Sequence, residues 1–309
     1  MMIPDYFRSK MKAMYGESGG VWADGAVQII LSLKEKLNLT FGEPFSLSYN
    51  FVVPVVLADD TSAVLKIGYP NKDFFNEYRA LGEFAGDAMV KVIDFDREAG
   101  WILLSHLKPG TGLHSLSDED ERLKIFASVA RRLWRKPSAP HPFPDVKAWS
   151  EGIQRYRARF HDGTGTLPEK MISKAESLFV QLLSSSKEQY LLHGDLHHEN
   201  ILYSRSSGWT AIDPKGLTGE REYDCIQYTL NHWKQHDEPY ELLKYRTSSL
   251  SSLLSLSYER LIAYGFCHSV LSACWCVEDV EDMEDARDCY ENGTAIAAMY
   301  EKLMGERKA

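Results

Sequence analysis

The spacing of hydrophobic positions separates a helix from a run of strands near the start of the chain. In residues 24–39, apolar side chains return every three or four positions, which is the period of an amphipathic helix. Two apolar runs follow, at 51–57 and 63–67, and the turn-forming pair Asp59 and Asp60 lies between them. This pattern predicts a helical segment followed by a β-meander.

A helix and two further strands complete the predicted N-terminal region. Asn71 stands where a helix N-cap is expected, and apolar residues return at helical spacing after it. Strands are predicted at 89–94 and 101–107, and Pro109 and Gly110 then break the chain. This order of elements predicts a compact β-rich lobe with one helix packed against its sheet.

Beyond residue 108 the apolar period is mostly helical. Two short apolar runs, at 190–192 and 209–212, each end in polar residues and predict short strands that present a loop. We therefore expect an α+β protein with a small N-lobe at 1–106 (helical segment, antiparallel sheet and one helix) and a larger, mainly helical C-lobe at 107–309 that carries the catalytic loop and the substrate site. Helical periodicity is found at 123–134, at 171–183, from 223 onward and at 257–304.

The composition fits a globular protein and narrows its partners. With 309 residues, 44% hydrophobic and 12% aromatic, the chain can bury a core large enough for two lobes. Its formal net charge of -9 provides no basic field for nucleic acid or an anionic membrane, and it favours a cationic partner. No pattern in the chain indicates an obligatory protein partner.

Targeting signals and cysteine spacing bear on the compartment. The sequence has no uninterrupted apolar run of about 18 residues, and its N-terminus lacks the apolar centre of a secretory signal. We therefore expect a cytoplasmic protein without a membrane span. The cysteines show no zinc-finger spacing, and reduced thiols are expected. They are Cys225, Cys267, Cys274, Cys276 and Cys289.

The strongest chemical pattern is the run HGDLHHEN at 193–200, followed after one hydrophobic segment by AIDP at 211–214. Phosphoryl transfer from ATP needs a carboxylate near the acceptor hydroxyl, and an Asn and a second Asp that hold metal ions against the triphosphate. Asp195 and Asn200 are five positions apart on one predicted loop, as in the catalytic loop of protein kinases, and Asp213 ends the next predicted strand. Any one of these residues alone would indicate a turn or a cap, but the ordered set predicts a kinase.

These motifs resemble those of the aminoglycoside phosphotransferase family, and the resemblance covers nearly the whole chain. The run TAIDPKGLTGEREYD, taken with HGDLHHEN, is similar to the branch that contains streptomycin 6-phosphotransferases and hydroxyurea phosphotransferases. The resemblance implies a protein-kinase-like two-lobe fold. It also implies an enzyme that uses ATP and Mg2+ to phosphorylate a hydroxyl group of a small molecule.

For the catalytic loop, the resemblance implies a role for each residue. Asp195 would be the catalytic base or the carboxylate that positions the hydroxyl, and Asn200 and Asp213 would bind Mg2+. His193 would brace the loop, and Asp224 would hydrogen-bond to the loop backbone from the following helix.

A lysine and a glutamate in the N-lobe form the second part of the predicted site. Lys66 lies in an apolar predicted strand and Glu77 on the following predicted helix. In kinases such a lysine reaches the α- and β-phosphates, and the helix carboxylate fixes its position. Without the downstream loop, an outward-facing lysine on an edge strand and a solvent-facing glutamate would be the simpler interpretation.

The nucleotide contacts of the N-lobe are expected in two further segments. The run WILLSHLKPG resembles the interlobe hinge of the family, which implies adenine contacts near Ser105 and Leu107. The first hairpin, at 46–50, has no GxGxxG pattern, so serine and backbone donors are expected to cover the triphosphate.

The acceptor is the least constrained part of the prediction. Aminoglycosides are polycations, and carboxylates suited to them occur at 278–285 and at Glu199, Glu220 and Glu222, although an acidic helix is usually a solvated face. The leading hypothesis is phosphorylation of an aminoglycoside, at the 6-hydroxyl of streptomycin. The alternatives are a kinase of hydroxyurea or of an unrelated small metabolite, and a nucleotide-binding pseudokinase that acts through a partner. The complete catalytic set argues against a pseudokinase.

Overall fold

The computed structural model of the protein describes residues 4–45, 47, 49–86, 88–161, 163, 165–278 and 286–306. The chain divides into two compact units. Met1–Thr111 and Leu202–Ile212 form the first unit, and Gly112–Ile201 and Asp213–Ala309 form the second.

Helix α1, Asp5–Lys36, begins well before the helix predicted at 24–39 and ends slightly short of it. Gly16 kinks the helix with a φ of 65°, a left-handed conformation that glycine adopts without strain. Phe7 and Met11, before the kink, are fully buried in the same core as the first sheet. The apolar pattern did not predict the first half of α1, because polar residues and glycines interrupt its helical period.

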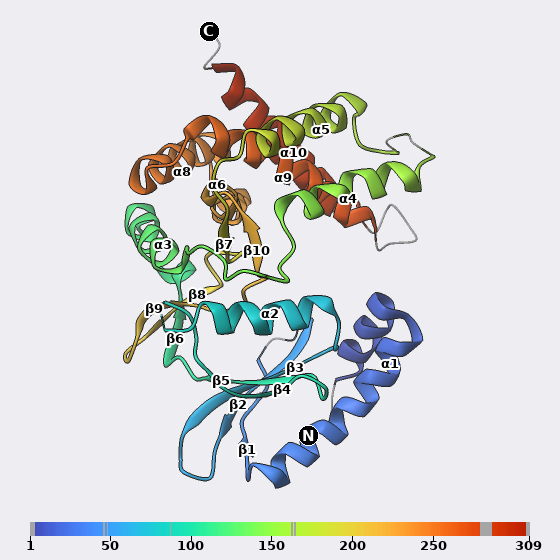
Figure 1. Ribbon diagram of the computed structural model, residues 1–309, viewed down its shortest axis with the longest axis vertical. Helices are drawn as coiled ribbons and strands as arrows, with labels where there is room; N and C mark the ends of the chain where they lie inside the picture. The colour runs from blue at the N-terminus through green and yellow to red at the C-terminus, as the bar shows by residue number, and fades with distance from the viewer. Residues whose placement is uncertain are drawn as a thin grey trace. The chain divides into compact units, whose positions relative to one another are not determined.

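The first unit is built on an antiparallel sheet with strand order β1-β2-β3-β5-β4 (Figure 1). Along β2, every second residue from Phe51 is buried, as expected for a strand with one face on the core. The predicted meander and the two later strands are therefore confirmed. The strands are β1 Thr40–Phe41, β2 Asn50–Val56, β3 Ser62–Gly68, β4 Val92–Asp96 and β5 Trp101–Ser105.

Helix α2, Lys72–Glu83, lies across one face of this sheet (Figure 1). Its predicted N-cap is confirmed, because the Asn71 side chain accepts a hydrogen bond of 2.9 Å from the backbone N–H of Phe74. Asn76, Glu77 and Leu81 of the helix are buried. A buried glutamate on this face needs a partner, which the sheet supplies.

The strands β6, β8 and β9 form a separate three-stranded sheet, which differs from the prediction at two of its strands. Pro109 and Gly110 begin the strand β6, Pro109–Gly112, and do not simply break the chain. Strand β8, Ile201–Ser204, was not predicted, because Asn200 and the polar residues before it hide a run of only four residues. Its partner β9, Gly208–Ala211, was expected within 209–212.

The second unit is mainly helical, with one small sheet in which β7, Tyr190–Leu192, pairs with β10, Leu217–Gly219. Helix α4 was not predicted, although Asp145 caps it with a bond of 2.7 Å from the N–H of Ala148. The helices are α3 Glu119–Leu133, α4 Val146–Arg159, α5 Glu169–Ser184, α6 Arg221–Asp224, α7 Ile226–Leu230, α8 Pro239–Leu254, α9 Tyr258–Glu278 and α10 Arg287–Glu306, with short 3-10 turns at Leu113–Ser115 and Trp233–Gln235.

The helical stretch predicted at 257–304 contains two helices, α9 and α10, which pack side by side with α4 and α5 against α9 (Figure 1). Gly265 permits this approach, because a Cβ at that position would lie 2.2 Å from the Tyr300 ring. In the described part of the chain, α9 alone is long and apolar enough to cross a membrane, but 78% of its most apolar window is buried within the protein. That burial is typical of a core helix.

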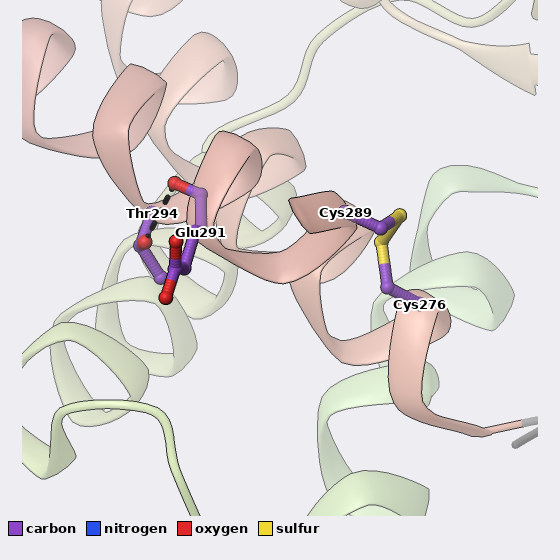
Figure 2. The surroundings of a disulfide bond; sticks show 4 residues. All are labelled: Cys276, Cys289, Glu291 and Thr294. Carbon is purple, nitrogen blue, oxygen red and sulfur yellow. Dashed lines mark hydrogen bonds between the residues drawn. A yellow bond between two sulfur atoms is a disulfide. The ribbon is translucent and has the colours of Figure 1, made fainter. Parts of the chain in front are cut away.

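The expectation of five reduced thiols is wrong for two of the cysteines. Cys276 near the end of α9 and Cys289 in α10 form a disulfide, with their Cα atoms 5.8 Å apart (Figure 2). Cys225, Cys267 and Cys274 are buried free thiols. The spacing of 13 residues between the paired cysteines did not reveal the bond, because only the packing of α10 against α9 brings them together.

Candidate active site

A buried carboxylate holds the backbone of the loop that follows β7. Asp224 accepts hydrogen bonds from the backbone N–H groups of His193 at 3.1 Å and Gly194 at 2.7 Å, and from the indole N–H of Trp134 at 2.8 Å. Burial raises the pKa of Asp224, while the charge of His193 and these hydrogen bonds oppose the rise. The predicted bond between Asp224 and the loop backbone is confirmed.

Asp195 is half-buried at the centre of this loop. Its backbone N–H donates to Nδ1 of His193 at 3.2 Å, which is the bracing contact expected of that histidine. The Asn200 side chain donates from Nδ2 to the Asp195 carbonyl oxygen at 2.8 Å, and the same nitrogen lies 3.1 Å from Nε2 of His197. The loop thus brings Asp195 and Asn200 together through its own hydrogen bonds.

Glu199 is surrounded by polar partners from two segments. His197 donates from Nδ1 to its carboxylate at 2.9 Å, Asn231 donates at 2.6 Å, and His232 contacts the other oxygen. Burial opposes ionisation, but the hydrogen bonds and charges of the two histidines outweigh it and lower the pKa of Glu199 to about 2. Glu199 is therefore an anion, and its contacts with Asn231 and His232 connect the catalytic loop to the segment after α7.

His198 is a core residue. Its ring is fully buried and stacks on Tyr228 with centroids 4.2 Å apart, and its two ring nitrogens have no hydrogen-bond partner among the residues that the structure describes. Burial, aided by the charge of Arg246, lowers the pKa of His198 to about 2. No group of three or more His, Cys, Asp or Glu side chains in the described part of the chain could hold a metal ion.

Asp213 follows β9 and has a φ of 57°, in the left-handed region that few residues other than glycine occupy. The chain then turns back toward the catalytic loop, where the Lys215 N–H donates to the His193 carbonyl at 2.7 Å. Asp213 thus lies at a sharp change in chain direction just after β9. The second unit contains all three of the predicted catalytic and metal-binding residues, Asp195, Asn200 and Asp213.

Lys66 and Glu77 form an ion pair in the first unit, with 2.6 Å between Nζ and Oε1. The side chains are only 3% and 11% exposed, so the pair is shielded from water on the central strand β3 and helix α2. A buried charge pair of this kind is retained only when its geometry is good. The structure thus contains the predicted pair, and the simpler interpretation of two solvent-facing side chains is wrong.

The predicted hinge continues from β5. The Ser105 backbone N–H donates to the Lys91 carbonyl at 2.8 Å, so this donor is already used within the first unit. The Ser105 hydroxyl accepts from the Lys91 N–H at 3.2 Å, and Leu107 is buried. Ser46 and Ser48 of the first hairpin lie outside the described residues.

Two of the carboxylates considered for a cationic acceptor have structural partners. Glu220 accepts from Arg260 and from the Tyr264 hydroxyl at 2.7 Å, and Glu222 accepts from the Ser257 N–H at 3.1 Å. Of the acidic run at 278–285, Glu278 pairs with Arg155 at 3.1 Å, and the rest lies outside the described residues. These contacts favour structural roles for Glu220 and Glu222.

Sequence reasoning missed an aromatic group next to the catalytic loop. Trp149 of α4 and Trp275 of α9 lie with ring centroids 5.5 Å apart, and Trp149 lies close to Gly194, where an added Cβ would be 3.5 Å from Cη2 of its ring. His268 of α9 is close enough to Asp195 for the carboxylate to influence its pKa. The sequence signal was weak, because aromatic residues on helices usually indicate core packing.

Comparison with known proteins places these observations in a family. A family model described as aminoglycoside/hydroxyurea antibiotic resistance kinase matches residues 40–280. Streptomycin 6-kinase of Streptomyces griseus is 25% identical over 295 residues, covering 90% of this chain and 91% of that protein. Hydroxyurea phosphotransferase of Kitasatospora aureofaciens is 26% identical over 272 residues, covering 86% of this chain and 77% of that protein.

The solved structures agree on the fold. A thermostable mutant of aminoglycoside phosphotransferase APH(4)-Ia, in a ternary complex with ADP and hygromycin B, matches with a TM-score of 0.62 and 15% identity, covering 87% of this chain and 97% of that chain. The protein-kinase-like fold, with a β-rich N-lobe and a mainly helical C-lobe, is therefore confirmed. The family match extends over more than two thirds of the chain, including the catalytic loop. The chain belongs to the family of aminoglycoside/hydroxyurea antibiotic resistance kinases.

Proposed function

We propose that the protein transfers the γ-phosphoryl group of ATP to a hydroxyl of an aminoglycoside, at the 6-hydroxyl of streptomycin. The observation that carries the proposal is the catalytic loop, in which Asp224 holds the backbone of His193 and Gly194 and Asn200 holds the backbone of Asp195. The name of the S. griseus relative supports streptomycin as the acceptor. The overall negative charge of the chain favours such a cation.

In this mechanism Asp195 orients the acceptor hydroxyl and accepts its proton as the oxygen attacks the γ-phosphorus. The bond from the γ-phosphorus to the bridging oxygen breaks in line, ADP leaves, and the acceptor becomes a phosphate ester. Lys66, held by Glu77, would contact the α- and β-phosphates and offset their charge. The main chain of Leu107 would contact adenine, along with groups of Ser105 other than its N–H.

The donor set of the second unit fits Mg2+. Asn200 uses its amide nitrogen within the loop, which leaves the amide oxygen as the atom suited to a metal, and Asp213 adds a carboxylate. Mg2+ prefers oxygen ligands and in kinases takes many of them from phosphates and water, so two protein ligands are sufficient. Bound there, Mg2+ would neutralise charge on the phosphates.

Hydroxyurea is the second candidate acceptor. The K. aureofaciens relative is a hydroxyurea phosphotransferase, and the family model includes both activities in its description. A neutral acceptor of this size would need only Asp195 and its immediate surroundings. A pseudokinase is disfavoured, because Lys66, Glu77, Asp195, Asn200 and Asp213 are all present.

The test is ATP consumption by the purified protein with Mg2+ and a panel of streptomycin, other aminoglycosides and hydroxyurea. We expect streptomycin-dependent turnover that falls by at least about a hundredfold in Asp195→Asn, the scale of a lost general base. Asp145→Asn, on the exposed cap of α4, is the matched control and should retain turnover. Full activity in Asp195→Asn would refute the mechanism, and turnover of hydroxyurea alone would favour the second candidate.

A further inference from the structure

The aromatic side chains beside the catalytic loop have no role in the phosphoryl transfer described above. We propose that Trp149 and Trp275 form a surface that binds a cationic group of the acceptor, a guanidinium or an ammonium, next to Asp195. The identity of the acceptor rests on the proposed function. The preference for a cation rests on the geometry of this surface.

The two indoles are placed by close packing between helices of the second unit. Their rings meet edge to face, with centroids 5.5 Å apart and an interplanar angle of 82°, and both side chains are only half-buried. A Cβ on Gly152 of α4 would lie 2.7 Å from Nε1 of Trp275, so glycine is needed for the indole to lie against α4. Rings fixed in this way lose little conformational entropy when a ligand binds.

The same surface reaches the catalytic loop. Gly194 has a φ of 80°, and a Cβ built on it would lie 3.5 Å from Cη2 of Trp149, which is van der Waals contact. Trp149 therefore lies close to the residue immediately before Asp195, as do the Cβ atoms of Lys215 and Leu217. A group bound on the Trp149 ring would be held near the carboxylate that is proposed to receive the hydroxyl.

His268 completes the group and is uncharged. The Gln227 amide nitrogen lies 3.3 Å from its Nε2, and the Tyr223 oxygen lies 2.8 Å from its Nδ1, so each ring nitrogen contacts an uncharged polar group. Burial lowers the pKa of His268 to about 4, although Asp195 opposes the shift. At neutral pH this histidine therefore does not repel a cation near Asp195.

Charge and ring chemistry together select the ligand class. The face of an indole carries negative quadrupole density and attracts a guanidinium or an ammonium, most strongly where water is excluded. Asp195, the residue after Gly194, adds a carboxylate to the same loop. Arg155 lies on the α4 side near Gly152, but its charge is offset by Glu278 at 3.1 Å. A neutral acceptor would gain little from this arrangement.

The experiment measures streptomycin binding by titration calorimetry, with a non-hydrolysable ATP analogue and Mg2+ present so that no transfer occurs. We compare the wild type with Trp149→Leu, Trp275→Leu and Trp275→Phe. Each leucine variant should raise the Kd for streptomycin at least about tenfold, which corresponds to about 1.4 kcal/mol, and Trp275→Phe should raise it less because it keeps an aromatic face. The Kd for the ATP analogue should stay within about twofold of wild type, as a check that the variants are folded.

Trp209→Leu is the matched control. Trp209 is also half-buried and meets an aromatic ring edge to face, Tyr203 at 5.4 Å, but it belongs to β9 in the first unit. It should leave streptomycin binding unchanged. Unchanged binding in both leucine variants, parallel loss of the ATP analogue, or no binding of streptomycin by the wild type would each overturn the inference.

The two proposals fail in different ways. Tryptophan-dependent binding of streptomycin without any turnover would keep the aromatic cation site and refute the proposed reaction. Turnover of streptomycin that is insensitive to both leucine substitutions would keep the reaction and refute the site. Hydroxyurea provides an internal control: if the wild type turns it over, Trp275→Leu should leave the KM for this neutral acceptor unchanged.

Discussion

Asp224 links the core of the second unit to the catalytic loop through a single carboxylate. Asp224→Ala would remove the acceptor of two buried backbone N–H groups, at a cost of about 1–3 kcal/mol each, and of the partly buried indole N–H of Trp134. We therefore expect the free energy of unfolding to fall by at least about 2 kcal/mol, with a loss of turnover. Urea unfolding followed by fluorescence measures the first effect, and ATP consumption measures the second.

Asp145→Ala is the control for this measurement. Asp145 also accepts from a backbone N–H, that of Ala148, but it does so on an exposed helix end. Loss of such a cap costs about 1 kcal/mol, and the catalytic loop should keep its activity. Equal losses of stability in Asp145→Ala and Asp224→Ala would contradict the view that the buried carboxylate anchors the loop.

His268 makes stability depend on pH. Its pKa is about 4 in the folded protein, against an ordinary value of 6.5, so between these values the unfolded chain binds more protons than the native one. The contribution of His268 to the free energy of unfolding is therefore complete above about pH 6.5. It is lost as the pH falls toward 4, and for this fully buried group the loss is up to about 3 kcal/mol. The urea midpoint of the wild type should fall over this range.

The contribution of His268 is isolated by substitution. Because other buried groups such as His198 titrate in the same direction, the readout is the difference between wild type and His268→Gln. Glutamine has no proton to gain, so the midpoint of the variant should change less between pH 7 and 4.5. Parallel curves for the two proteins would show that the imidazole is not held neutral.

At the scale of elements, the disulfide joins α9 to α10. A cross-link across 13 residues reduces the entropy of the unfolded chain and stabilises the fold by about 3 kcal/mol. Reductant should therefore lower the thermal midpoint of the wild type, as measured by circular dichroism, but not that of the Cys276→Ser/Cys289→Ser double variant. An equal response of both proteins, or five reactive thiols in the denatured, unreduced wild type, would refute the bond.

At the scale of the whole molecule, nucleotide binding and stability should be linked. A ligand at about a hundredfold its Kd stabilises the native state by about 2.7 kcal/mol, so Mg2+ and ATP together should raise the thermal midpoint by several degrees. The Lys66→Met/Glu77→Gln variant removes the phosphate contact without leaving a buried charge alone, and should lose most of this increase. A full increase in the variant, or the same increase after Mg2+ is chelated, would contradict the proposed roles.

Element by element, local pattern predicted most of the first unit and less of the second. The Asn71 cap and the strands around Lys66 follow from signals within a few residues, which local physics is enough to interpret. Strand β8 and helix α4 were missed, because tertiary pairing and packing stabilise short or weakly periodic segments. The division at residue 107 remains a prediction.

The sequence by itself determined the reaction class, because phosphoryl transfer requires an ordered set of side chains on one loop and the next strand, and order is a property of the chain. It also identified Lys66 and Glu77 as a candidate pair. Only the tertiary structure decided which groups hold the catalytic loop in place, which cysteines are joined, and that Trp149 lies close to Gly194 and packs against Trp275. These facts depend on contacts between residues far apart in the chain, and no local pattern encodes such contacts.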